Sequence, residues 1–450
     1  MPPHAIIIAA GALLALLCLW AALRAGRKRR LIDNIPTIKT TGVFIGLVEL
    51  KGSIESERPL VSYIAQTPCV SYAWSIDEHW SRTVVETYTD AQGKTQTRTR
   101  SESGWTNVAR GGEEQVFYLR DDCGVIRVAP EKAKLESALV FSQTCGPSDP
   151  LYYGKGPPGA VSDSDHRRQF VEHAIPLHAP IYVLGQARQR QDVVAPEVAY
   201  DPHAPMFLIS TRSEAQVRAG YSGQYWALAL LGLVLGVAAW VLCDHLLARE
   251  PAWRAGGHVL NLDPAARLPV YADVGAAYLA AWLLGWVWMV YNSLVDLRQR
   301  VRQAWSNVDV QLKRRCDLIP SLVRVVEGLR DYERNVQTEL AELRRQLVAT
   351  PPDQPGPDPG GCAVHLRAVI EKYPELKAND AFMSLHRSLV DTEQRISLAR
   401  GYFNDIATFY NSRLQIVPDR FVAALAHLRP QPLSVAEDFE RAGVDVKLVT

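Results

Sequence analysis

Three uncharged apolar stretches limit the folds open to this chain more than any other feature of its sequence. They cover residues 5–23, 225–243 and 274–295. A helix of about 20 residues rises 1.5 Å per residue and so spans the roughly 30 Å hydrocarbon core of a bilayer. We therefore predict a membrane protein with transmembrane helices at 5–23, 225–245 and 274–295, for which the lipid bilayer is the first partner.

The charges beside the first stretch predict how the chain enters the membrane. No Lys or Arg precedes it in residues 1–4. A basic cluster follows it and consists of Arg27, Lys28, Arg29 and Arg30. A secretory signal peptide has the reverse pattern, and basic residues favour the cytoplasmic side, where anionic headgroups attract them. We expect a retained anchor with its N-terminus outside and the basic cluster at the inner membrane surface.

Two further crossings complete the predicted topology. Counted from an outside N-terminus, they place residues 24–224 and 296–450 in the cytoplasm and the loop at 246–272 outside. Arg298 and Arg300, directly after the third stretch, agree with this direction. The sequence thus predicts an integral protein of a bacterial inner membrane with both soluble parts cytoplasmic.

The composition excludes several other classes of protein. The 450 residues are 48% hydrophobic and 22% charged, which excludes a wholly disordered chain. The net charge of +1 gives no global field that would attract nucleic acid. Seven cysteines without a C-x-x-C pair do not supply the close ligands of a zinc finger or RING. We expect no metal, no cofactor and no nucleic-acid partner.

Residues 42–215 have the composition of a soluble β-rich domain. Short runs rich in β-branched and aromatic residues predict strands, and Asp90–Gly93 has the residues of a hairpin turn. The expected strands are Val43–Val48, Cys69–Trp74, Arg82–Tyr88, Gln115–Leu119, Val125–Val128, Ile181–Leu184 and Phe207–Thr211.

Two features of this region have the residue types of a site but not the required spacing. The possible zinc or iron ligands are His166, His173, His178, Asp163 and Asp165. In a turn-rich stretch they have no fixed common face, so we interpret them as a solvated loop. Gly154–Gly159 lacks the Gly-Lys-Ser/Thr ending of a phosphate loop and indicates a flexible linker.

Four ordered motifs of the β-rich region carry a family resemblance. They are Arg58–Ser62, Pro68–Val70, Phe117–Pro130 and Ala179–Ala187. In this order, ahead of a membrane span, they resemble the GIDE domain of membrane-anchored E3 ubiquitin ligases. The resemblance implies a β-rich fold beside a membrane. In that family the ligase activity belongs to a separate C-terminal RING, and the C-terminal part here has only two cysteines, Cys316 and Cys362.

The chain after the third apolar stretch has helical periodicity. Apolar residues recur in steps of three and four from Val301 to Leu347, which predicts one long amphipathic helix. No Gly or Pro separates this helix from the membrane span, so we expect a continuous rod of about 75 residues. Pro320 removes one backbone donor and should bend the rod without ending it.

A second periodic stretch predicts a partner for this helix. The Pro- and Gly-rich residues 351–361 turn the chain back. The apolar seam that follows predicts a helix that packs antiparallel on the first. Its residues are Phe382, Leu385, Leu389, Thr392, Ile396, Ala399, Phe403, Ile406 and Tyr410. A short helix at 363–372 would complete a bundle over 293–428, and residues 429–450 indicate a flexible tail.

Several blocks of this region resemble the LemA family. The blocks are Tyr291–Val295, Ala304–Arg315, Asp317–Val323, Tyr373–Asn379, Thr392–Ile396 and Tyr402–Asp405. The resemblance implies a membrane-anchored antiparallel helical bundle that faces the cytoplasm, in a family whose biochemical activity is poorly defined. The Pro-rich stretch at 351–361 departs from a plainly helical connection.

One polar segment of the first long helix is a candidate interaction surface. Its residues are Trp305, Asp309, Gln311, Lys313, Arg314, Arg315 and Asp317. The alternative is a solvated face, on which Lys313 pairs with Asp309 or Asp317 along the helix near anionic headgroups. The aromatic residues Trp305, Tyr402 and Phe409 exceed what a short bundle can cover and predict a self-association patch.

These observations favour a membrane-anchored, non-enzymatic scaffold or interaction protein that forms a homo-oligomer and binds a protein partner that the sequence does not identify. The alternative is an E3 ubiquitin ligase-like transferase, suggested by the GIDE resemblance and disfavoured because a RING is not encoded. A hydrolase is disfavoured because the sequence has neither a G-x-S-x-G nor an H-E-x-x-H motif.

Overall fold

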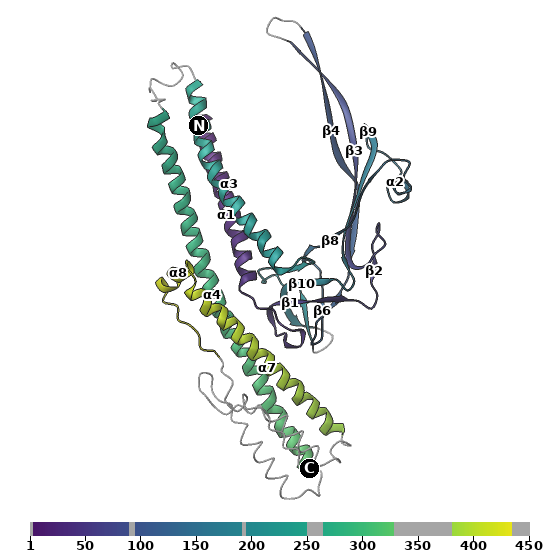
Figure 1. Ribbon diagram of the computed structural model, residues 1–450, viewed down its shortest axis with the longest axis vertical. Coiled ribbons are helices and arrows are strands. Elements are labelled where there is room, and N and C mark those ends of the chain that lie inside the picture. The colour runs from purple at the N-terminus through teal and green to yellow at the C-terminus, as the bar shows by residue number, and fades with distance from the viewer. Residues whose placement is uncertain (1–2, 90–94, 191–194, 250–263, 328–379, 434–450) are drawn as a thin grey trace, which may run out of the picture. The chain divides into compact units, whose positions relative to one another are not determined.

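A computed structural model describes residues 3–89, 95–190, 195–249, 264–327 and 380–433 (Figure 1). The chain divides into two compact units. The helical unit consists of Met1–Pro36 and Ala215–Thr450, and the β unit consists of Thr37–Glu214. The mixed α+β class predicted from the sequence is therefore confirmed.

A seven-stranded sheet forms one half of the β unit. Its strand order is β1-β5-β6-β11-β10-β12-β7, and β1 also pairs with β10, which closes five of the strands into a ring. The strands are β1 (Gly46–Glu55), β5 (Phe117–Arg120), β6 (Val125–Val128), β7 (Lys134–Glu136), β10 (Pro180–Gln189), β11 (Pro196–Ala199) and β12 (Leu208–Ser210). Leu50, Leu119, Val128 and Val183 are fully buried within it.

A second, five-stranded sheet forms the other half. Its order is β2-β3-β9-β8, and β4 pairs with β3. The strands are β2 (Leu60–Val61), β3 (Pro68–Thr89), β4 (Thr95–Glu114), β8 (Ala138–Cys145) and β9 (Ser164–Pro176), and the short helix α2 covers Pro150–Gly154. Beyond Trp80, where pairing with β9 ends, β3 and β4 continue as a two-stranded ribbon (Figure 1).

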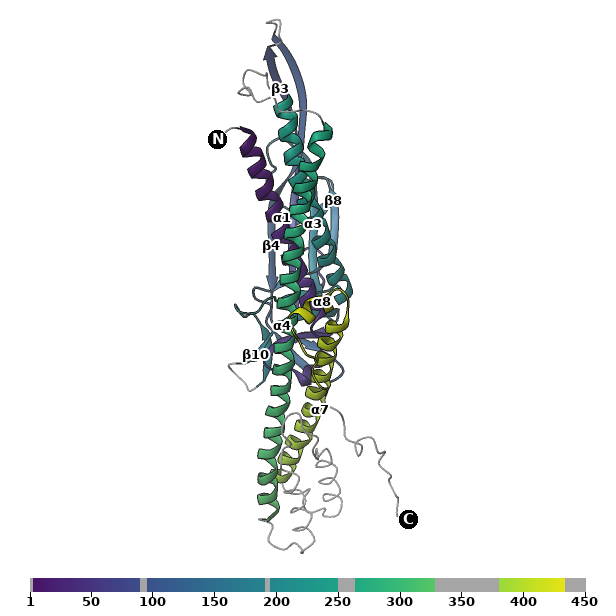
Figure 2. The same ribbon diagram turned by 90° about the vertical axis from the view of Figure 1, so that its left-hand side faces the viewer.

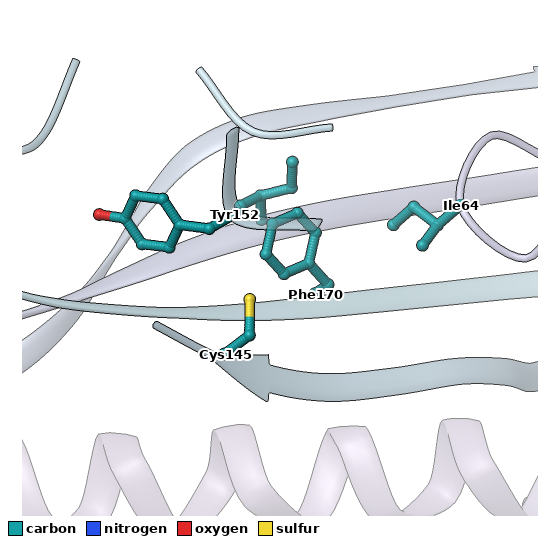
Figure 3. Packing of buried hydrophobic residues seen from close by; sticks show 5 residues of the cluster. Ile64, Cys145, Tyr152 and Phe170 are labelled. Carbon is teal, nitrogen blue, oxygen red and sulfur yellow. The ribbon is translucent and has the colours of Figure 1, made fainter. Parts of the chain in front are cut away.

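The core of the second sheet gathers residues from distant parts of the β unit. Ile64, Cys145, Tyr152 and Phe170 lie together between the strands and the α2 segment (Figure 3). Phe170 is fully buried, and Tyr152 is only 1% exposed. Burial of such side chains contributes roughly 1.5–3 kcal/mol each, so this cluster fixes β9 and α2 against β3.

The structure corrects two sequence predictions in the β unit. Cys69–Trp74 and Arg82–Tyr88 belong to one strand, β3, whose polar middle hides its continuity. The stretch around His166 and His173 is strand β9, not a solvated loop. Its inward positions include Arg168 and Glu172, so the usual alternation of apolar and polar residues is masked. The predicted turn at Asp90–Gly93 lies outside the described residues.

The predicted membrane spans lie in three long helices of the helical unit. These are α1 (Pro3–Asp33), α3 (Glu214–Arg249) and α4 (Pro264–Glu327). The segments long and apolar enough to cross a membrane are Ile6–Asp33, Glu214–Cys243 and Pro269–Arg315. Each helix extends beyond the apolar run that predicts it, because charged residues continue the helix without a break.

Small residues bring α1, α3 and α4 close together. A Cβ added at Gly11 of α1 would lie 2.1 Å from the Cβ of Ala239 in α3, and one added at Gly232 of α3 would lie 3.0 Å from the Cβ of Cys18. Glycine at such positions lets helix backbones approach, as in membrane helix pairs. Large apolar side chains remain exposed around this bundle, including Leu16, Trp20, Leu230, Val234, Leu279 and Leu284.

Helix α4 continues past the apolar run and packs on α7 (Asp380–Gln415), which is followed by the short helix α8 (Asp419–Leu425) (Figure 2). Trp305 contacts Phe403, and Arg315 contacts Glu393. Residue numbers therefore rise along α4 while they fall along α7, so the two helices are antiparallel, as predicted. Helix α4 passes through Pro320 without ending. The Pro-rich residues 351–361 and the short helix expected at 363–372 lie outside the described residues.

Candidate functional site

The structure divides the predicted interaction surface between two environments. Arg315 is buried and lies 3.5 Å from Glu393 of α7, and the indole of Trp305 meets the Phe403 ring edge-on at 4.9 Å. Gln311 is half-buried, and its Oε1 has no hydrogen-bond partner. The exposed members are Asp309, Lys313, Arg314 and Asp317. The seven residues therefore do not form one continuous surface.

The prediction that Trp305, Tyr402 and Phe409 form an exposed aromatic patch on the helix pair is wrong. Tyr402 is buried, and Trp305 is half-buried against Phe403. Phe409 alone among the three aromatic residues is exposed, at 39%. The reason is geometric: the antiparallel packing of α4 on α7 covers the seam on which Trp305 and Tyr402 lie.

The basic cluster lies at the C-terminal end of α1, and Arg27, Lys28 and Arg30 contact neighbouring helices. The guanidinium of Arg27 lies 3.9 Å from the centre of the Trp288 ring in α4. The ammonium of Lys28 lies 5.7 Å from the Tyr221 ring in α3. Cations over aromatic rings are stabilised by the ring quadrupole. The cluster thus joins α1 to both of the other long apolar helices.

Arg30 of this cluster forms the strongest of these contacts. Its two terminal nitrogens each donate to one oxygen of Asp419, at the start of α8, over 2.8 Å. The Asp419 side chain is 3% exposed and that of Arg30 is 15% exposed. Two parallel charge-assisted hydrogen bonds fix orientation as well as distance. Residues 389 positions apart in sequence are joined here.

Further polar groups extend this contact into a network across the helix ends. Arg413 of α7 donates to Asp33 over 3.3 Å and to Asn34 over 3.2 Å, and lies 3.9 Å from Asp419. Asn34 is buried and donates to Ser293 of α4 over 2.9 Å. We call this set, Arg30, Asp33, Asn34, Ser293, Arg413 and Asp419, the helix-end junction.

The charged groups of the helix-end junction are paired with one another across helices. Its two arginines balance its two aspartates, and each buried charge has an opposite charge within ion-pair distance. Such pairing is what permits charges to be buried at all. The sequence offers no local signal for it, because its members come from four segments that meet only after folding.

A second polar centre lies inside the β unit and was not predicted. Arg168 of β9 and Glu78 of β3 are both at most 1% exposed and form an ion pair at 3.1 Å. Tyr152 donates to Glu78 over 3.1 Å, and Ser164 donates to the same carboxylate. Although burial raises the pKa of Glu78, hydrogen bonds from Ser164, Arg168 and Tyr152 hold it below its ordinary value.

The remaining donors of Arg168 are satisfied by backbone. Its guanidinium donates to the carbonyls of Tyr152, Pro157 and Gly159 over 2.9, 2.8 and 2.7 Å. The prediction of a flexible linker at Gly154–Gly159 is therefore wrong, because carbonyls of this stretch bind the buried guanidinium of Arg168. With its guanidinium so engaged, Arg168 organises the fold and is not poised to bind a ligand.

The possible metal ligands considered above, His166, His173, His178, Asp163 and Asp165, do not gather into one cluster among the residues that the structure describes. His79 lies 2.6 Å from Asp165, His178 lies 3.1 Å from Glu55, and His166 lies near the hydroxyl of Tyr152. These are separate contacts of His79, His178 and His166, each with a different partner residue.

Another set, Asp121, Asp122 and Cys123, does lie together. However, Asp121 accepts hydrogen bonds from Thr40 and from the amides of Cys123 and Gly124, and Lys39 pairs with Asp122. Burial raises the pKa of Asp121, but the hydrogen bonds from Thr40, Cys123 and Gly124 hold it below its ordinary value. The oxygens are engaged within a turn, so we do not interpret the set as a metal centre.

Comparisons with known families match two segments of the chain. Residues 304–448 match the model of the LemA family, and residues 85–243 match the GIDE model, described as E3 Ubiquitin ligase. The chain therefore joins a segment similar to the GIDE model, called the GIDE region below, to a segment similar to the LemA model, called the LemA region. Both resemblances predicted from the sequence motifs are confirmed. The GIDE region begins within β3 and extends into α3, and the LemA region begins within α4.

Curated relatives share only part of the chain. Magnetosome protein MamQ of Magnetospirillum gryphiswaldense is 25% identical over 167 residues, which are 30% of this chain and 61% of that protein. Magnetosome protein MamQ 2 of Paramagnetospirillum magneticum is 24% identical over 210 residues, which are 40% of this chain and 76% of that protein. Protein LemA of Metamycoplasma hominis is 22% identical over 203 residues, which are 41% of this chain and 90% of that protein.

The helix-end junction connects these regions with segments outside both. Arg413 and Asp419 belong to the LemA region, whereas Arg30, Asp33 and Ser293 belong to neither matched segment. Arg218, which lies 3.6 Å from Asp33, belongs to the GIDE region. The LemA region is thus tied to α1 and α4 by specific polar contacts.

Proposed function

We propose that this protein is a membrane-anchored scaffold without enzymatic activity, which holds a GIDE-type β unit and a LemA-type helix pair on one side of a membrane. The helix-end junction is the observation that carries this proposal. It joins the ends of the apolar helices to α7 and α8 through buried contacts between balanced charges. A scaffold needs such fixed contacts to hold its soluble parts in position.

The arrangement of helix ends supports a common side for both soluble parts. The contact of Asp33 with Arg218 brings the C-terminal end of α1 and the N-terminal end of α3 together, and along the chain the β unit is the segment that connects these two helices. Asp419 and Arg413 meet the same end of α1. The basic cluster at this end favours the cytoplasmic face of a bacterial inner membrane.

The E3 ubiquitin ligase-like alternative is supported by the GIDE match alone. A RING holds its conjugating enzyme on a surface ordered by zinc, and the ligands come as closely spaced cysteine and histidine pairs. The sequence has seven cysteines and no C-x-x-C pair. Function follows from a site and not from a fold, so we favour the scaffold.

A scaffold of this kind is proposed to assemble through its helix pair. Val310 of α4 is 59% exposed, and Val390 and Phe409 of α7 are 44% and 39% exposed. These apolar side chains lie beyond the uncharged apolar stretch that ends at residue 295. Tethering to a membrane raises the effective concentration of such surfaces, so weak contacts suffice for association.

We expect the detergent-solubilised chain to be a homo-oligomer at micromolar concentration, as measured by light scattering with correction for detergent. The double variant Val310→Asp/Phe409→Asp should shift the mass toward the monomer, because a charge opposes burial of either position. The matched control Val85→Asp, on an exposed position of the β unit, should leave the mass unchanged. A wild-type protein that is strictly monomeric would contradict assembly by this route.

A further inference from the structure

We propose that residues 416–425, which we call the α8 foot, insert into the lipid bilayer and form a fourth membrane contact of the chain. This goes beyond the scaffold role, although it rests on the proposal that α1, α3 and α4 cross the membrane. The occupants of its outer face are the acyl chains and headgroups of that same bilayer.

The outer face of the α8 foot is apolar and uncovered. Its large side chains Ile416, Val417, Phe421 and Leu425 are 50%, 63%, 68% and 78% exposed. Four such side chains within ten residues form an apolar patch that water would solvate poorly. The other face packs on α4, where Val422 and Ala423 join Val290 and Leu294.

The place of the foot along α4 puts this patch beside the membrane surface. Trp286 and Val287 also pack against the Val422 cluster. A Cβ on Gly26 would lie 2.9 Å from the sulfur of Met289, and Arg27 lies over Trp288. The foot is therefore level with the basic cluster of α1, the depth at which arginine, lysine and tryptophan meet lipid headgroups.

The charges of the α8 foot suit this depth. Its acidic residue, Asp419, is buried in the bidentate pair with Arg30, so no carboxylate faces outward. Its basic residue, Arg420, is exposed and can meet anionic headgroups. A short segment with an apolar outer face and an exposed cation is the pattern of an interfacial helix. A second protein copy would not require the patch to lie at this level.

Photocrosslinking of the full chain tests this inference. The photoreactive residue p-benzoylphenylalanine would replace Phe421 or Leu425, one at a time, in protein reconstituted into vesicles of phosphatidylethanolamine and phosphatidylglycerol. Two control positions calibrate the result: Leu231, an exposed apolar residue of α3, and Val390, an exposed residue of α7 far from α8 along that helix. Adducts are identified by mass spectrometry.

We expect positions 421 and 425 to give lipid adducts at a yield similar to that at position 231 and several-fold above that at position 390. Lipid adducts at 231 but not at 421 and 425 would overturn the inference and leave the membrane-anchored scaffold intact. Crosslinks from 421 to a second protein chain would overturn it in favour of a protein contact. A lack of lipid adducts at 231 would overturn both proposals.

Discussion

Replacement of Arg168 by leucine is expected to lower the free energy of unfolding of the β unit by about 3–5 kcal/mol, the usual effect of removing one partner of a buried ion pair. The change leaves the Glu78 carboxylate buried without its cation. It also removes the hydrogen-bond donor of three backbone carbonyls in and after α2. Hydrogen exchange of β3 and β9 in the full chain, followed by mass spectrometry, measures the loss locally.

Arg82→Leu is the matched control, because Arg82 pairs with Glu102 on the exposed part of the ribbon and such pairs contribute about 0–1 kcal/mol. The difference in the free energy of unfolding between Arg168→Leu and the wild type should also become smaller in acid. The folded pKa of Glu78 is lowered from 4.5, so its stabilising effect is present above pH 4.5 and is lost as the pH falls through that lower folded pKa. Equal exchange in the two variants would contradict this account.

Asp419→Ala is expected to release α8 and the end of α7 from α1, at a local cost of about 2–4 kcal/mol, because two arginines of the helix-end junction lose their shared carboxylate. Hydrogen exchange in a peptide covering α8 should rise by orders of magnitude. The apolar helices should keep their protection, since their close packing does not depend on Asp419.

Asp391→Ala provides the comparison for this second prediction. Asp391 pairs with Arg395 on the surface of α7, one helical turn apart, and such pairs contribute about 0.3–0.5 kcal/mol. The same chemical change should therefore leave exchange of α8 unaltered. The helix-end junction would lose its proposed role if Asp419→Ala and Asp391→Ala had the same effect.

The sequence predicts the helices well because their signals are local. The buried positions of α7 include Leu389, Ile396, Phe403 and Tyr410, each a predicted seam residue. The apolar runs likewise lie within α1, α3 and α4. In both cases each residue's burial follows from its spacing to neighbours a few positions away, and this spacing is visible in the sequence.

The polar centres could not be predicted in this way. Arg30 and Asp419 meet across 389 positions, and nothing near either residue indicates the other. Strand β9 was missed for a related reason, since Arg168 occupies an inward position that the alternation rule assigns to an apolar residue. A charge can occupy such a position only because Glu78 and three carbonyls satisfy it, and these partners become visible only in the folded chain.

The side of the membrane on which the soluble parts lie is the central claim, and cysteine labelling in spheroplasts tests it most directly. Single added cysteines at Val85 in the β unit, Val390 in α7 and Gly256 in the expected external loop are compared with the unmodified chain, using a maleimide that does not cross membranes. We predict added labelling of intact spheroplasts at Gly256→Cys alone, with Val85→Cys and Val390→Cys labelled only after permeabilisation. Labelling of Val85→Cys, Val390→Cys or both in intact spheroplasts would contradict a scaffold whose two soluble parts share the cytoplasmic side.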